Sequence, residues 1–279
     1  MVAALPCCGL GAPGGKSFGV CCLLGGDEQS MGPVKVRFLG TGDAVGSGGR
    51  LQTCIQVQAG DQSFLIDCGA TSLTAMKRLG VDPASIDLIL VSHLHGDHFG
   101  GIPFFVIDAQ FGRRVKPLHV AGPPGIENRV KESLEVFFPG SSQIQRKFDA
   151  RFVELPEGRD TFLDALAVRP YGVVHPSGAV SYALRVQVGG KIIAYSGDTE
   201  WTASLLEAAR GADLFICEAY YFRKKIKYHL DYETILDHRS QLDCRRIILT
   251  HMNQDMLDRL EESEMECAED GREILLEGP

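Results

Sequence analysis

One short stretch constrains this chain more than any other, because three histidines and an aspartate crowd into it. It runs from Ser92 to His98 and has the sequence Ser-His-Leu-His-Gly-Asp-His, in a protein with only eight histidines. Imidazole and carboxylate are the ligands that zinc, iron and manganese favour. The stretch directly follows Asp87 to Val91, an apolar run typical of a buried strand. A histidine-rich surface loop is the alternative, but the position after a buried strand favours a metal site.

We call the stretch from Ser92 to His98 the histidine loop. The spacing of its polar residues determines how many metal ions it can bind. On an extended segment, His93, His95 and Asp97 alternate toward one side. If the chain turns into a helix near Asp97, His98 can point toward a second metal. Gly96 permits such a turn because glycine has no Cβ to clash.

Three later polar residues supply the ligands that a second metal needs. His175, Asp198 and His251 each follow an apolar β-type run. Polar residues at the carboxyl edge of a sheet tend to form sites there. Each residue alone could be a hydrogen-bonded structural group. Together with the histidine loop they predict one dinuclear centre.

The rest of the chain mixes strands with helices. Strands are expected at Val34–Leu39, Thr53–Gln58, Ser63–Ile66, Asp87–Val91, Leu118–Ala121, Arg151–Leu155, Leu166–Val174, Val180–Val188, Lys191–Tyr195, Leu214–Cys217 and Arg246–Thr250. Helices are expected at Thr71–Leu79, Gly125–Phe138, Trp201–Arg210 and Tyr232–Ser240. This mixture predicts a layered α/β sandwich.

Composition limits the partners and the compartment. The formal net charge is −8, which argues against a polyanionic partner, although Arg223 to Lys227 forms a local basic patch. No apolar run approaches the length of a membrane span, so no membrane association is expected. The cysteines after residue 50 are scattered among apolar residues, as reduced buried thiols are, which indicates the cytoplasm.

The first 31 residues differ from the remainder. They are rich in glycine and small residues, and their only cation is Lys16, which does not match the layout of a signal peptide. We expect residues 1–31 to be a flexible extension and residues 32–279 to form the folded domain that carries the candidate metal site, with Met31 as an alternative start. A metal-binding tail is a second interpretation, but the cysteine pairs match no common zinc pattern. Those cysteines are Cys7, Cys8, Cys21 and Cys22.

The order His-x-His-x-Asp-His, followed by single His, Asp and His, resembles the metal-ligand order of the metallo-β-lactamase superfamily. Other motifs resemble its ribonuclease Z branch: Phe38 to Gly42, Ile66 to Gly69, Ser92 to His98, Gly122 to Ile126, and Ser196 to Thr199. The resemblance extends from about Val34 to Glu277. It implies the four-layer αββα fold, and it is far less specific for the substrate.

The resemblance also implies a ligand assignment. His93, His95 and His175 would hold one metal, Asp97, His98 and His251 the other, and Asp198 would bridge them. Two divalent ions are expected, with Zn²⁺ as the first choice and Mn²⁺ or Fe as alternatives. A metal pair lowers the pKa of a water held between the ions. Asp67 would accept a hydrogen bond from a ligand histidine, unless it only forms a turn.

The ribonuclease Z branch places a glutamate after the next strand and a histidine shortly beyond. Glu218 and His229 occupy those places here, although the family has His where Cys217 stands. We expect His229 to be the general acid for the leaving oxygen, oriented by Glu218, with Asp97 as the third catalytic residue. A surface histidine at a helix start is the alternative for His229.

The segment between His175 and Asp198 has room for one hairpin, whereas ribonuclease Z enzymes that bind transfer RNA usually carry a long arm there. Transfer RNA is therefore not an expected partner. The arm-less branch resembles cyclic phosphodiesterases, so we expect hydrolysis of small or cyclic phosphodiesters. A lactonase or β-lactamase-like carbonyl hydrolase is the alternative. A redox di-iron protein is a third interpretation, although such relatives replace a motif histidine with Glu, and His95 is intact.

The remaining histidines are weaker candidates. His119 is expected half-buried in a strand, and His238, between Asp237 and Arg239, is expected to face solvent. Arg50 and Tyr220 carry no signal that separates them from surface residues. Members of the branch that this chain resembles are often dimers, so the resemblance also implies a homodimer.

Overall fold

The computed structural model describes residues 32 to 277, and within them two seven-stranded sheets face each other. The expected extension at residues 1–31 lies outside the described residues. The strand order of the first sheet is β14-β1-β2-β3-β4-β5-β6. Its members are β1 (Val34–Gly40), β2 (Cys54–Ala59), β3 (Gln62–Ile66), β4 (Leu88–Leu90), β5 (Leu118–Gly122), β6 (Ala150–Glu154) and β14 (Glu273–Leu276).

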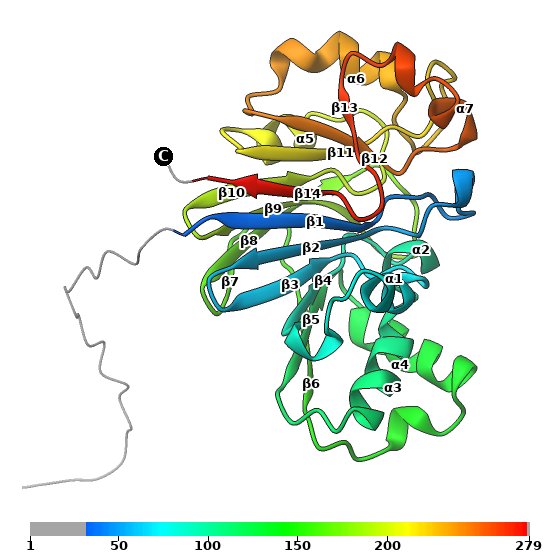
Figure 1. Cartoon of the computed structure of the whole chain (residues 1–279), viewed down its shortest axis with the longest axis vertical. Coiled ribbons are helices and arrows are strands. Elements are labelled where there is room, and N and C mark those ends of the chain that lie inside the picture. The colour runs from blue at the N-terminus through cyan, green and yellow to red at the C-terminus, as the bar shows by residue number, and fades with distance from the viewer. Residues whose placement is uncertain (1–31, 278–279) are drawn as a thin grey trace, which may run out of the picture. The chain divides into compact units, whose positions relative to one another are not determined.

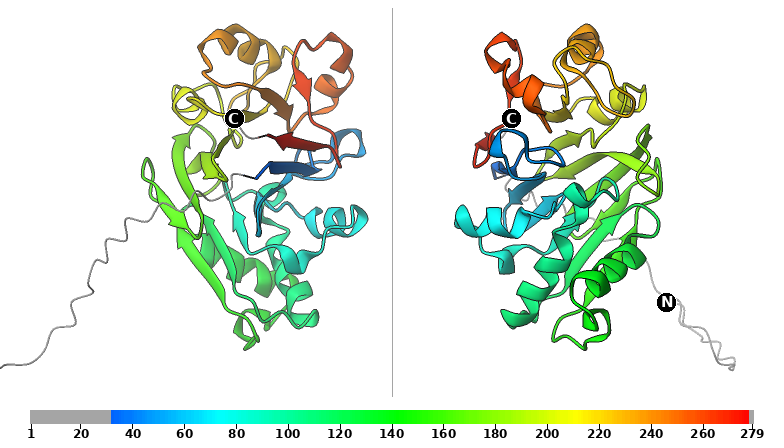
Figure 2. Two further views of the ribbon diagram at one scale, coloured as in Figure 1. Left: turned by 60° about the vertical axis from the view of Figure 1, so that its left-hand side comes forward. Right: turned by 90° about the vertical axis from the view of Figure 1, so that its right-hand side faces the viewer.

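The second sheet has the order β13-β12-β11-β10-β9-β8-β7. Its members are β7 (Thr161–Leu163), β8 (Leu166–Val173), β9 (Ser181–Val188), β10 (Lys191–Tyr195), β11 (Leu214–Glu218), β12 (Ile247–Thr250) and β13 (Glu266–Cys267). Figure 2 shows β14, in red, lying beside β1, in dark blue, although the two strands come from opposite ends of the described chain.

Helices cover the outer face of each sheet (Figure 1). The first sheet carries α1 (Ser72–Arg78), α2 (Gly96–Phe99), α3 (Ile102–Phe111) and α4 (Ile126–Phe137). The second carries α5 (Ser204–Ala209), α6 (Tyr232–His238) and α7 (Gln254–Leu257). Short 3₁₀ turns lie at Ser47–Gly49, Pro83–Ser85, Ser141–Gln143, Arg239–Gln241 and Leu260–Glu262. The expected four-layer αββα sandwich is therefore confirmed.

Three apolar clusters hold the four layers together. In β4, Leu88 and Leu90 point into the core between the sheets, while Ile89 points toward α1 to α4. In β11, Ile216 faces the same inter-sheet core and Phe215 packs beneath α5 to α7. Because these central strands are covered on both faces, their sequences are continuously apolar and do not alternate.

The parallel strands determine where polar residues can gather. β3, β4, β5 and β6 are parallel in the first sheet, and β10, β11, β12 and β13 are parallel in the second. Their carboxyl ends lie at one edge of each sheet, so the segments that follow β3, β4, β10 and β12 emerge side by side.

Most predicted elements are present, and three differences have physical reasons. The helix expected from Trp201 is shorter and begins at Ser204. The sequence did not predict α3, because its apolar residues surround the whole helix and show no helical period. It also did not predict β7, β13 and β14, which have only two to four residues each. Across residues 32–277, none of the helices combines the length and apolar character that a bilayer crossing demands.

Candidate metal centre

The histidine loop leaves the buried strand β4 and turns at Gly96 into the short helix α2. Beneath it, the segment after β3 packs closely: the Cys68 amide donates to the His98 carbonyl, and the Gly101 amide donates to the Cys68 carbonyl. A Cβ on Gly101 would lie 2.2 Å from the Gly69 carbonyl oxygen. Glycine is therefore required where these two loops cross.

The early turn into α2 sends the ligand candidates to two different clusters. Nitrogen atoms of His93, His95 and His175 lie within 4.8 Å of one another, and we call these residues the first cluster. Nε2 of His175 is 2.9 Å from Nδ1 of His95. In an extended loop, Asp97 would lie with these three histidines. Helix α2 instead places Asp97 in a different group, together with His98.

The second cluster comprises Asp97, His98 and His251. Nε2 of His98 is 3.2 Å from Oδ2 of Asp97, and Nε2 of His251 is 3.8 Å from the same oxygen. His251 directly follows β12, and its amide donates to the Thr41 carbonyl. All three side chains are buried.

Asp198 lies between the two clusters. Its Oδ2 is 3.8 Å from Nε2 of His93 and 3.1 Å from Nε2 of His251, while its Oδ1 is 3.4 Å from Nε2 of His98. A single carboxylate therefore faces both triads. The preceding Gly197 has φ 58°, and a Cβ there would lie 2.6 Å from the Tyr182 carbonyl oxygen. Only glycine lets the chain turn tightly enough to bring Asp198 here.

Several of the inward-facing atoms have no hydrogen-bond partner. Among the described residues these include buried His93 Nε2, His98 Nε2, Asp97 Oδ2 and Asp198 Oδ1. Buried polar atoms are nearly always paired, so each unpaired atom needs an explanation. Imidazole nitrogens and carboxylate oxygens that converge without partners fit a pair of divalent cations.

The outward nitrogen atoms of the same histidines, in contrast, are held by the protein. Nδ1 of His98 is 2.7 Å from Asp67 Oδ2, and Nδ1 of His93 is 3.0 Å from Ser92 Oγ. Nδ1 of His175 is 2.8 Å from the Tyr228 carbonyl oxygen, and Nδ1 of His251 is 3.1 Å from Thr53 Oγ1. Metal-binding histidines characteristically use their second nitrogen in this way, which fixes the ring orientation.

Asp67 is the centre of this supporting network. It is fully buried, and it accepts hydrogen bonds from the backbone amide and the hydroxyl of Ser92, each at 2.8 Å, as well as contacting His98. Its φ of 58° lies in the left-handed region, as does the φ of 57° at His251. Non-glycine residues are held there only when surrounding contacts require it, and such residues concentrate at functional sites.

Replacing Asp67 by asparagine tests this network. Asparagine tolerates the left-handed conformation and keeps the shape, but its amide cannot supply a carboxylate's charge to His98. We expect metal affinity to fall by about 10- to 100-fold, measured by competition with a chelating dye. Asp87→Asn is the matched control, because Asp87 pairs with Arg114 and Lys116 away from the clusters. Equal affinities in the two variants would contradict the assignment.

The two clusters differ in their electrostatics. Burial lowers the pKa of His93 well below its usual value and the pKa of His175 to about 4, so both rings are neutral. Burial opposes protonation of His98 and His251 as well, but nearby carboxylates, above all Asp198, outweigh it. The pKa of His251 is therefore raised to about 9, and that of His98 well above its usual value.

His229 and Glu218 form a hydrogen-bonded pair beside Asp198. His229 Nδ1 is 2.9 Å from Glu218 Oε2 and 3.9 Å from Asp198 Oδ2. Glu218 ends β11 and is fully buried, and its Oε1 accepts a hydrogen bond from the Thr199 amide. Burial, followed by the charge of Asp198, raises the pKa of Glu218 to about 7. Burial lowers the pKa of His229, but its hydrogen bond to Glu218 outweighs this and raises it overall.

The structure also places residues that the sequence did not single out. The Tyr220 ring stacks on the His229 ring with centroids 4.6 Å apart, so Tyr220 belongs to the site and is not simply a surface residue. Arg50 instead donates to Thr41 Oγ1. His119 is half-buried in β5, as expected. His238 is also half-buried, stacked on Trp201 at 4.0 Å, and so does not simply face solvent as we had expected.

Comparison with known proteins places this geometry in a family. A family model described as "Anti-Pycsar protein Apyc1" matches residues 34–274. A ribonuclease Z of Lachnoclostridium phytofermentans is 25% identical over 270 residues, which cover 78% of this chain and 87% of that protein.

Two solved structures share the fold. The metallo-β-lactamase fold protein YhfI from Bacillus subtilis aligns with a TM-score of 0.72 and 19% identity, over 88% of this chain and 99% of that one. A diphosphatase from the PhnP family aligns with a TM-score of 0.68 and 20% identity, over 88% and 98%. The chain thus has the metallo-β-lactamase fold, is a ribonuclease Z-like metallo-hydrolase, and belongs to the family of the anti-Pycsar protein Apyc1.

Proposed function

We propose that the protein is a phosphodiesterase with a dinuclear metal centre that hydrolyses small or cyclic phosphodiesters. The observation that carries the proposal is the hydrogen-bonded pair of His229 and Glu218, which adjoins Asp198 and both clusters of ligand candidates. A hydrolase of phosphate esters uses such a pair for the leaving oxygen, whereas carbonyl hydrolysis can proceed without one.

The ligand set divides between two ions. His93, His95 and His175 would hold one, the second cluster would hold the other, and Asp198 would contact both. Two divalent ions held together lower the pKa of a water and stabilise charge on phosphoryl oxygens. The mixture of imidazole and carboxylate supports Zn²⁺, with Mn²⁺ or iron as alternatives.

The residues of the chain then have separate roles. Glu218 is held by the Thr199 amide and in turn holds His229 Nδ1, so the His229 ring is fixed with Nε2 left for the substrate. A protonated His229 can donate from Nε2 to the departing oxygen while its Nδ1–H donates to Glu218. Tyr220, stacked on His229, limits rotation of the ring. Glu218 and Tyr220 are thus positioning residues, and His229 is the catalytic acid.

A small substrate is supported by the topology next to the site. Between His175 and Asp198 the chain forms only the antiparallel strands β9 and β10, so it has no arm that could grip transfer RNA. The net charge of −8 gives no general attraction for a polyanion. We therefore propose that transfer RNA is not a substrate.

The reaction class can be tested directly. Protein loaded with Zn²⁺ is expected to hydrolyse bis(p-nitrophenyl) phosphate or 2′,3′-cyclic nucleotides. Removal of the metal by a chelator should abolish turnover, and added Zn²⁺ or Mn²⁺ should restore it, because the ligand atoms alone provide no nucleophile. Metal content is measured on the same samples. Fully metal-loaded protein that hydrolyses no phosphodiester would refute the proposal.

A carbonyl hydrolase is the second candidate, since the same ligand set can serve an ester or amide. It would hydrolyse lactones or nitrocefin, and the His229→Ala variant would then retain nearly full activity. A panel of lactones beside the phosphodiesters therefore separates the two reactions.

The compartment and the oligomeric state are also part of the proposal. The five cysteines from Cys54 onward are free thiols, and three of them are buried, which supports a reducing compartment such as the cytoplasm. A homodimer is proposed by analogy with members of the ribonuclease Z branch. Light scattering of the purified protein would test this oligomeric state.

A further inference from the structure

A pocket of about 380 Å³ opens directly beside His229, and His229 itself forms part of its wall. The volume suits a small chemical group and not a macromolecule. Trp201 and Thr234 line it along with Lys225 and Lys227. A substrate whose leaving oxygen reaches His229 therefore has room to place a further group here.

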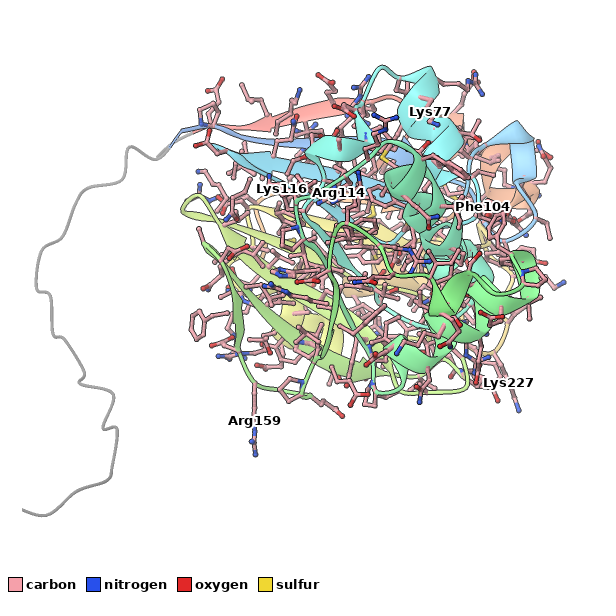
Figure 3. All side chains as sticks on the ribbon, turned by 90° about the horizontal axis from the view of Figure 1, so that it is seen from below. Lys77, Phe104, Arg114, Lys116, Arg159 and Lys227 are labelled. Atoms are coloured by element: carbon pink, nitrogen blue, oxygen red, sulfur yellow. The ribbon has the colours of Figure 1, made fainter. Side chains whose placement is uncertain are left out.

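The two lysines belong to the basic patch between β11 and α6, and the four cations of that patch are not equivalent. Arg223 Nε is 2.9 Å from Glu233 Oε1, and Lys224 Nζ lies 4.8 Å from the centre of the Tyr221 ring. Neither of them lines the pocket. Within residues 32–277, Lys225 and Lys227 have no salt-bridge partner, and both are exposed. Figure 3 shows Lys227 extending out from the ribbon.

The acidic residues of the pocket are already engaged by the protein. Glu200 Oε1 accepts a hydrogen bond from the Tyr228 amide at 2.9 Å. Asp231 is buried, and its two oxygens accept from the Thr234 amide and hydroxyl at the start of α6. The carboxylates therefore fix the walls of the pocket, while the ammonium groups at its rim remain available to a ligand.

We propose that this pocket binds a second anionic group of the substrate, and that Lys225 and Lys227 hold that group while the phosphodiester lies at the ligand clusters. The inference rests on the proposed phosphodiesterase function and narrows its substrates to phosphodiesters that carry another phosphate or carboxylate. Two cations on an acidic protein also attract such a substrate toward the site before it binds.

Two matched substrates test the inference. Thymidine 5′-(methyl phosphate), whose 5′ oxygen is protonated as it departs, is compared with the same compound bearing a 3′-phosphate, and release of the nucleoside is measured. At low salt, the wild type is expected to show about five- to tenfold higher kcat/KM for the 3′-phosphorylated substrate, since each exposed ion pair contributes modestly. In the double variant Lys225→Gln/Lys227→Gln the ratio should fall to about one, and turnover of the unphosphorylated substrate should change by less than about twofold.

The control is Arg223→Gln/Lys224→Gln, which removes the same charge from the same loop outside the pocket and should keep the preference. A wild-type ratio of one, or an equal ratio in the wild type and the Lys225/Lys227 variant, overturns the inference. Failure of both substrates in metal-loaded protein instead refutes the proposed function. Calorimetry with thymidine 3′,5′-bisphosphate and thymidine 5′-phosphate then still decides the inference, because the wild type must bind the bisphosphate more tightly and the double variant must not.

Discussion

Replacing Asp198 by asparagine is expected to lower kcat/KM for a phosphodiester by at least about 10³-fold, equivalent to roughly 4 kcal/mol of transition-state stabilisation. The carboxylate approaches histidines of both clusters, at 3.8 Å to His93 and 3.1 Å to His251. An amide offers one neutral oxygen in place of two charged ones. The two proposed metal ions would then lose the carboxylate that would contact both, and metal analysis should find fewer than two ions per chain.

Asp213→Asn is the matched control for Asp198→Asn. Asp213 lies in the same half of the protein, where it accepts from the Ile192 amide and pairs with Lys191 and Arg245 at the far end of β10. That variant should keep its metals and its kcat/KM even if its unfolding temperature falls by a few degrees. Retention of activity in Asp198→Asn, with two ions still bound, would contradict the bridging role.

The sequence allowed much of the centre to be anticipated, because its side chains follow strands. Asp198 and His251 come one to three residues after β10 and β12, and parallel strands bring their carboxyl ends to one edge. The structure places all seven ligand candidates together there. Their role as ligands stays a prediction until metal is measured.

The supporting contacts could not be anticipated in the same way. The partner of His175 Nδ1 is the backbone carbonyl of Tyr228, a residue held at φ 72°. Every residue has a carbonyl, so no side-chain pattern marks this one. Likewise, α3 has Phe104 and Phe111 exposed on one side and Phe105 and Val106 buried on the other. With apolar residues on both faces, hydrophobic periodicity cannot reveal a helix.

The second large effect concerns His229. His229→Ala is expected to lower kcat by about 10²- to 10⁴-fold for a substrate with an alkoxide leaving group, such as a 2′,3′-cyclic nucleotide, because that oxygen must be protonated as it departs. The loss should be much smaller with bis(p-nitrophenyl) phosphate, since p-nitrophenolate departs without a proton. Metal content should remain unchanged, because the ligand clusters keep all their atoms. Steady-state kinetics on both substrates, with metal analysis, measures the difference.

Glu218→Gln and His119→Gln complete this test. Glu218 acts through His229, so its variant should show the same dependence on the leaving group with a smaller loss, and the double variant His229→Ala/Glu218→Gln should be little worse than His229→Ala alone. His119 lies half-buried in β5, and its variant should leave both substrates unaffected. If His229→Ala slowed both substrates equally, His229 would not be the general acid. Its hydrogen bond to Glu218 would then serve to orient the His229 ring for binding the substrate. The comparison of the two leaving groups therefore decides whether His229 acts as the general acid or in substrate binding. An activated ester such as bis(p-nitrophenyl) phosphate, used alone, would not distinguish these roles.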